Sequence, residues 1–150
     1  MRKMVVALAF AVVLSGCFDE ELGLKEPQAT VTDNDAWMES PTFMVGDYRM
    51  RGIEGKVAFI DATFTAEGQK LMWHFWEEPE VVRGSFKVIG VQKETGEKVD
   101  VFAGPLGGEL NGAVAHAPSL VKLPQKGVWR LDVFVGAEAE AYYGSIVVHV

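Results

Sequence analysis

The stretch GVWRLDVFV (residues 127–135) gives the clearest indication of fold class in this sequence. Trp129 and every second residue after it are apolar, whereas Arg130, Asp132 and Phe134 lie between them. Successive side chains of a strand point to opposite faces of a sheet, so a period of two predicts a strand. One face of this strand is expected in the core and the other, carrying Arg130 and Asp132, in solvent.

Short runs of the same kind occur on both sides of this stretch, and turn-forming residues separate them. Gly and Pro are common in these turns because Gly permits positive φ and Pro presets φ. Regularly spaced short strands of this kind predict a β-sandwich or a barrel. The expected strands are Tyr48–Ile53, Lys56–Phe64, Leu71–Trp76, Gly84–Gln92, Lys98–Phe102, Ala113–Ala117, Val128–Val135 and Tyr142–Val150.

The pattern of Leu71–Trp76 does not show which face of this strand points into the core, because both faces are apolar. A Trp on a central strand of a sandwich commonly packs between the two sheets. We therefore expect Trp73 to point into the core, with Met72, His74 and Trp76 on the outer face. The opposite phase stays possible at this stage.

Three segments resemble the strand motifs of a lipoprotein family from Gram-positive bacteria that is known only as a domain of unknown function. They are KLMWHFW (residues 70–76), LPQKGVWRL (residues 123–131) and GSIVVHV (residues 144–150). The resemblance covers roughly residues 40–150 and implies an immunoglobulin-like fold, with no activity or catalytic residues. We therefore expect an all-β chain, an immunoglobulin-like β-sandwich of seven to eight strands.

The N-terminus has the layout of a secretory signal peptide, in which basic residues precede a short apolar run and small residues. Arg2 and Lys3 are followed by an unbroken apolar run from Met4 to Leu14. This run is too short for a transmembrane helix, which needs about 20 residues. The sequence LSGC (residues 14–17) resembles the lipobox of bacterial lipoproteins. The resemblance implies cleavage after residue 16 and lipid attachment at Cys17, the single cysteine.

The domain organisation follows from these segments. We expect a lipoprotein signal peptide over residues 1–16, an acidic flexible tether over residues 17–40, and a β-sandwich over residues 41–150. Trp37 and Met38 do not suit a spacer and are expected to dock onto the domain. A lipid at Cys17 would hold the domain at the cell membrane on its extracytoplasmic side.

Charge and motifs exclude several classes of function. The chain has 14 basic and 21 acidic residues, for a formal net charge of −7, so we expect no nucleic-acid partner. No catalytic motif is found, and we predict a non-enzymatic protein without a cofactor. Two alternatives stay open. One is zinc or copper handling by His74, His116 and His149, and the other is a hydrolase with an unrecognised carboxylate pair.

The favoured hypothesis is a binding module that recognises a protein, an envelope component or a small ligand through an exposed sheet face. Aromatic residues, Met and Arg are enriched at the cores of interfaces. The residues expected on this face are Met72, His74, Trp76, Arg130, Phe134, Tyr143 and His149.

Overall fold

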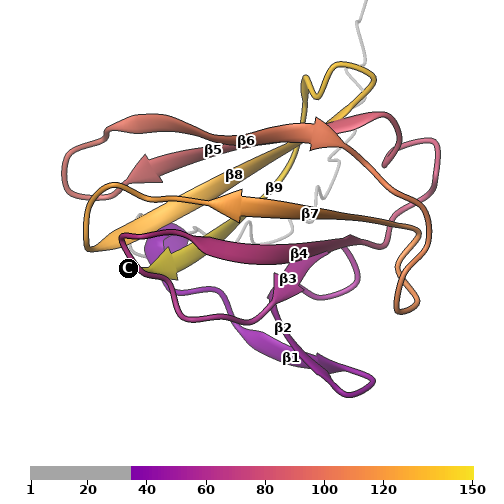
Figure 1. Ribbon diagram of the computed structural model, residues 1–150, viewed down its shortest axis with the longest axis horizontal. Coiled ribbons are helices and arrows are strands. Elements are labelled where there is room, and N and C mark those ends of the chain that lie inside the picture. The colour runs from indigo at the N-terminus through magenta and orange to yellow at the C-terminus, as the bar shows by residue number, and fades with distance from the viewer. Residues whose placement is uncertain (1–34) are drawn as a thin grey trace, which may run out of the picture. The chain divides into compact units, whose positions relative to one another are not determined.

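The computed structural model describes residues 35–150, which form an all-β sandwich of two antiparallel sheets (Figure 1). One sheet has the strand order β1-β2-β3-β4-β7, and the other has the order β6-β5-β8-β9. The elements are the 3-10 turn η1 (Asp35–Trp37) and the strands β1 (Thr42–Val45), β2 (Tyr48–Ile53), β3 (Val57–Ile60), β4 (Gln69–Phe75), β5 (Ser85–Gln92), β6 (Lys98–Pro105), β7 (Ala115–Val121), β8 (Val128–Gly136) and β9 (Ala141–His149). The expected signal peptide, Cys17 and the tether as far as residue 34 lie outside the described residues. Within residues 35–150, no helical segment has the length and hydrophobicity of a membrane span.

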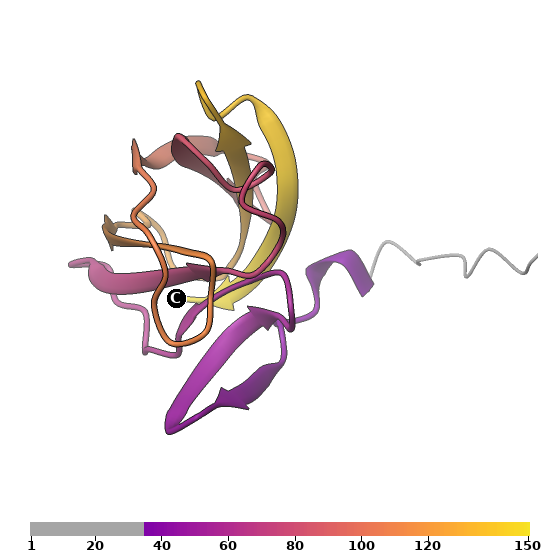
Figure 2. The same ribbon diagram turned by 90° about the vertical axis from the view of Figure 1, so that its right-hand side faces the viewer.

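The predicted all-β sandwich is confirmed, with nine strands in the described part of the chain instead of seven to eight. Each expected strand overlaps an observed one, and β1 is the additional strand. It has only four residues and is joined to β2 by a two-residue turn at Gly46, which has a φ of 56°. The hairpin of β1 and β2 extends away from the rest of the sandwich (Figure 2).

The core confirms that Trp73 points inward. Leu71, Trp73 and Phe75 are all buried, and the Trp73 ring lies 5.8 Å from that of Phe86 on β5 of the opposite sheet. The Trp73 indole Nε1 donates a hydrogen bond to Ser119 Oγ at 2.8 Å. The N–H group of the buried Trp73 ring therefore has a hydrogen-bond partner inside the core.

A β-bulge in β9 reverses the expected direction of Tyr143. Val133 pairs with Gly144, whereas the next residue, Phe134, pairs with Tyr142, so Tyr143 is an extra residue without a partner on β8. An extra residue shifts the alternation of side chains by one position. Tyr143 therefore lies buried in the core and Tyr142 faces outward, which contradicts the expected outward position of Tyr143.

The two sheets also divide the binding face that the sequence predicted. β4 pairs with β3 and β7, whereas β8 pairs with β5 and β9 in the other sheet. Met72 and His74 therefore lie on the outside of one sheet, and Arg130 and Phe134 on the outside of the other. The expectation of one continuous face is wrong, because alternation along a strand does not reveal which strands share a sheet.

Candidate binding groove

The described part of the chain contains a groove of about 930 Å³. It lies between the segment 35–41 and the outer face of β8 and β9. We call it the N-terminal groove. Small-molecule sites typically have volumes of about 300–1,000 Å³. Its lining residues are Asp35, Ala36, Met38, Glu39, Ser40, Pro41, Ile53, Lys56, Arg130, Asp132, Tyr142, Tyr143, Gly144, Ser145 and Val147.

A hydrogen-bonded network connects β8 and β9 in this groove. Arg130 donates two hydrogen bonds to Asp132, from Nε to Oδ1 at 2.7 Å and from Nη2 to Oδ2 at 3.1 Å. Ser145 Oγ donates to Asp132 Oδ1 at 2.6 Å, and the Tyr142 hydroxyl lies 2.8 Å from Ser145 Oγ. The hydrogen bond from Arg130 to Asp132 raises the pKa of the guanidinium further. The network is thus fixed in place, with one positive and one negative charge that neutralise each other.

The segment that precedes β1 packs onto this network through Trp37. The guanidinium of Arg130 lies 5.1 Å from the centre of the Trp37 ring, which is a cation–π contact. The docking of Trp37 agrees with the expectation from the sequence. Met38 does not dock in this way, because 64% of its surface stays exposed at the groove.

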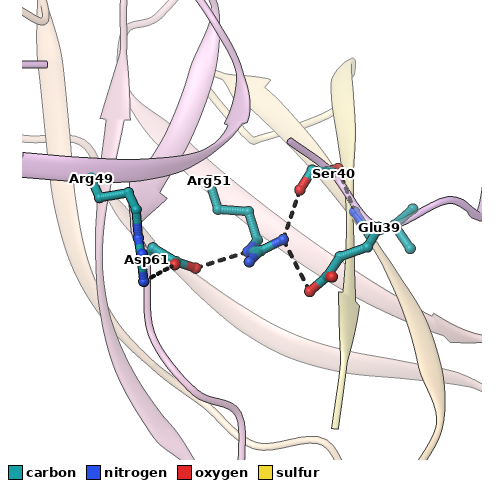
Figure 3. Close-up of polar contacts among 6 residues, drawn as sticks. Glu39, Ser40, Arg49, Arg51 and Asp61 are labelled. Atoms are coloured by element: carbon teal, nitrogen blue, oxygen red, sulfur yellow. Dashed lines mark hydrogen bonds and ion pairs between the residues drawn. The ribbon is translucent and has the colours of Figure 1, made fainter. Parts of the chain in front are cut away.

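A second anchor holds the same segment through Arg51 on β2 (Figure 3). Arg51 Nη1 donates to the carbonyl oxygen of Ser40 at 2.7 Å and lies 2.9 Å from Glu39 Oε1. Arg51 Nε donates to Asp61 Oδ1 at 2.8 Å, and Asp61 also pairs with Arg49 at 2.9 Å. Because Glu39 and Ser40 line the groove, Arg51 helps to fix its position relative to the sandwich.

Ser40 also occupies the free edge of β9. Its backbone nitrogen donates to the carbonyl oxygen of Val147 at 3.0 Å, and Val147 N donates to Ser40 Oγ at 2.9 Å. An open strand edge is a ready site for pairing with another chain. At Val147, Ser40 already satisfies these backbone groups.

The inward-facing Tyr143 supports the groove from below. Its hydroxyl donates to the carbonyl oxygen of Lys56 at 3.2 Å, and its ring packs against that of Phe75. Burial, together with the nearby carboxylate of Glu77, raises the pKa of Tyr143 to about 12. The hydroxyl is therefore protonated at neutral pH and acts as a hydrogen-bond donor.

Exposed apolar side chains gather at this groove. Residues 35–150 contain seven large hydrophobic residues that remain exposed, and Met38, Ile53 and Tyr142 are three of them. Scattered exposed apolar residues need no explanation, but a cluster that surrounds a polar network is typical of a binding surface.

The predicted residues on β4 lie elsewhere and are less accessible than expected. His74 is fully buried, and Trp76, just past the end of β4, stacks on it with ring centres 5.8 Å apart. His74 Nε2 accepts a hydrogen bond from Asn111 Nδ2 at 3.1 Å, so the loop between β6 and β7 covers it. Met72 is half-buried and lines a separate hollow of about 520 Å³ beside Leu120.

The structure does not bring the three histidines together. His74 and His116 are partners in the pairing of β4 with β7, whereas His149 pairs with Val128 in the other sheet. His149 lies at a third hollow, beside Glu39 and the residues of the Arg51 anchor. Among residues 35–150, no three His, Cys, Asp or Glu side chains are close enough to hold one metal ion.

Sequence reasoning located part of this site and missed the rest. Arg130 and Phe134 do share the outer face of β8, and the exposed aromatic beside them is Tyr142, with its ring 5.8 Å from that of Phe134. Gly144 is the signal that could have indicated that Tyr142 faces outward instead of Tyr143, because a glycine within a strand often marks a bulge. The docking of Trp37 was expected, whereas the anchoring of Glu39 and Ser40 was not, because the composition of this segment resembles that of a tether.

Comparison with known proteins gives a family and a related fold. A family model described as DUF4871, a domain of unknown function, matches residues 28–148. A crystal structure of a candidate lipoprotein from Bacillus anthracis is similar, with a TM-score of 0.62 and 24% sequence identity. The match covers 76% of this chain and 86% of that one, and at this identity it shows the fold alone. No curated protein matches the chain.

Proposed function

Because the chain belongs to the DUF4871 family of unknown function, we propose its role from its own residues: a lipid-anchored, extracytoplasmic binding module. In this proposal, lipid on Cys17 holds the protein at the cell membrane, and the N-terminal groove binds a ligand without catalysis. The observation that carries the binding role is the cluster of Met38, Ile53 and Tyr142 around a preformed polar network.

The anchoring role is supported by the N-terminal sequence. A basic start, an apolar run and the sequence LSGC (residues 14–17) fit a lipoprotein precursor. A single acyl chain binds a membrane only marginally, whereas two chains anchor a protein stably, and a diacylglyceryl group on Cys17 would supply two. The similar Bacillus anthracis protein is itself described as a candidate lipoprotein.

A binding role without catalysis is supported by the state of the charged groups in the groove. Arg130 and Asp132 are paired with each other, and Lys56 lies 3.3 Å from Glu77. A catalytic acid or base must be able to exchange a proton with a substrate, whereas these groups are held in pairs with each other. The paired groups are better suited to recognition than to proton transfer.

The anchoring role can be tested by fractionation of cells that express the chain with Cys17→Ala. We expect the wild-type chain in the membrane fraction, where added protease can digest it on intact cells. The variant should lose membrane attachment. A variant that remains in the membrane to the same extent as the wild-type chain would contradict the anchoring role.

The binding role can be tested by placing a photo-crosslinking amino acid at position 38 in living cells. Met38 is an exposed groove residue, and Leu120 on β7, with 58% exposure, is a matched control outside the groove. We expect a crosslinked product from position 38 and little from position 120. Equal yields from the two positions, or none from position 38, would remove the support for a binding groove.

A further inference from the structure

We infer that the ligand of the N-terminal groove is an uncharged saccharide chain. This inference rests on the proposed binding role and adds the chemical class of the ligand. It follows from three properties of the groove: the charges and hydroxyl groups of its lining, the edge of β9 that Ser40 occupies at Val147, and the exposed ring of Tyr142.

The charges that line the groove disfavour an anionic ligand. The acidic lining residues are Asp35, Glu39 and Asp132 and the basic ones are Lys56 and Arg130, an excess of one negative charge. In the polar network of the groove, Ser145 donates its hydroxyl proton to Asp132 and Tyr142 therefore donates to Ser145, so both hydroxyl oxygens keep lone pairs that can accept hydrogen bonds from a ligand. Sugar hydroxyls can donate such hydrogen bonds, so an uncharged hydroxyl-rich ligand complements this network.

The occupied edge of β9 disfavours an extended peptide. Peptides that bind to sheets typically add a strand to a free edge through backbone hydrogen bonds. Here Ser40 already bonds to both backbone groups of Val147. At this position of the edge, recognition falls to side chains, which is also how sugars are bound.

The ring of Tyr142 supplies the apolar contact that a saccharide needs. Tyr142 is 63% exposed. Its hydroxyl is hydrogen-bonded to Ser145, and its ring contacts Phe134 in an edge-to-face arrangement. A Tyr with an apolar ring and a polar tip suits a partly wet interface. One face of a sugar ring consists of C–H groups, which can pack on an aromatic ring.

Calorimetric titration of the full chain in detergent tests this inference. The detergent must lack a sugar head group, since such a head group would compete for the groove. The uncharged probes are hexasaccharides of β-1,4-linked N-acetylglucosamine, β-1,4-linked glucose and α-1,4-linked glucose, and the charged probe is a hyaluronan hexasaccharide. We expect at least one uncharged probe to bind and to bind more tightly than the charged one.

Two tyrosine variants show whether binding occurs in this groove. Tyr142→Ala should weaken binding by about tenfold, because it removes both the ring on which the sugar packs and the hydroxyl that accepts from it. Tyr48→Ala is the matched control, because Tyr48 on β2 is 45% exposed and does not line the groove. It should bind like the wild-type chain.

The outcomes separate this inference from the proposed function. The saccharide assignment is overturned if no uncharged probe binds, if hyaluronan binds more tightly, or if Tyr142→Ala binds like the wild-type chain. If position 38 still crosslinks in cells under any of these results, the groove binds a ligand of another class. If position 38 does not crosslink either, the binding role itself is lost.

Discussion

His74 has the environment of a buried neutral imidazole. Its Nδ1 lies 3.1 Å from the carbonyl oxygen of Met72, which can only accept, so Nδ1 carries the proton. Its Nε2 then accepts from Asn111, which a tight Asn-Gly turn with positive φ at both residues places over the sheet. Burial lowers the pKa of His74, and the nearby His116 lowers it further.

This environment predicts a loss of stability at mildly acidic pH. With its pKa lowered in the folded state, His74 takes up a proton more readily in the unfolded state, so protonation favours unfolding. The free energy of unfolding should fall as the pH drops below about 6.5, the ordinary pKa of histidine. Urea unfolding between about pH 5.5 and pH 7.5 measures this slope.

Two histidine variants test whether His74 causes this pH dependence of the free energy of unfolding. His74→Gln should flatten the pH dependence even if it lowers the overall stability. His149→Gln should retain it, because His149 is exposed at the end of β9. An unchanged slope in His74→Gln would show that the interpretation of His74 is wrong.

At the scale of elements, the segment 35–41 belongs structurally to the sandwich. Trp37 lies on β8 through Arg130, Ser40 pairs with β9, and Arg51 on β2 binds Glu39 and Ser40. The chain passes in this way along one sheet before it enters the other at β1. The groove exists because this segment is held at β8 and β9 of one sheet and at β2 of the other.

Arg51 and Arg49 form a matched pair for testing this attachment. Both bind Asp61, whose side chain is 8% exposed, but the Arg51 side chain is 17% exposed and the Arg49 side chain 67%. Arg51→Leu should lower the free energy of unfolding by about 1.5–3 kcal/mol, the range for hydrogen bonds to charged groups. Arg49→Leu should cost about 0–1 kcal/mol, as an exposed ion pair does.

Hydrogen exchange adds a local readout to the urea measurements. In Arg51→Leu, the amides of Ser40 and Val147 should exchange faster, because their mutual hydrogen bonds lose the support of the arginine. Equal losses of stability in the two arginine variants, with unchanged exchange at Ser40, would contradict the role assigned to Arg51.

Strands were easier to predict from the sequence than their arrangement. The alternation in β8 is local, and it correctly placed Trp129 inside and Arg130 outside. The bulge at Tyr143 interrupts the same kind of pattern, so alternation alone predicted the wrong tyrosine for the surface. The division of β4 and β8 between two sheets depends on long-range pairing, which no local period records. Predicting the groove requires both the position of the bulge and the pairing of the strands. Its polar network was therefore only partly predictable from the sequence.

At the scale of the whole molecule, the groove and the expected anchor are close in sequence. The described structure begins at Asp35, which lines the groove, and the proposed lipid attachment site is Cys17 in the same chain. The excess of acidic over basic residues disfavours contact between the domain and anionic head groups. In the proposed role, the lipid therefore provides the attachment to the membrane, and the sandwich provides the recognition.

In the proposed role, this β-sandwich works outside the cell membrane while attached by lipid at Cys17. Mass spectrometry of the chain isolated from its native cells tests this attachment. We expect a mature chain that begins at Cys17 and whose N-terminal peptide carries the mass of a diacylglyceryl group. A chain that retains Met1, or a Cys17 with an unmodified thiol, would contradict it.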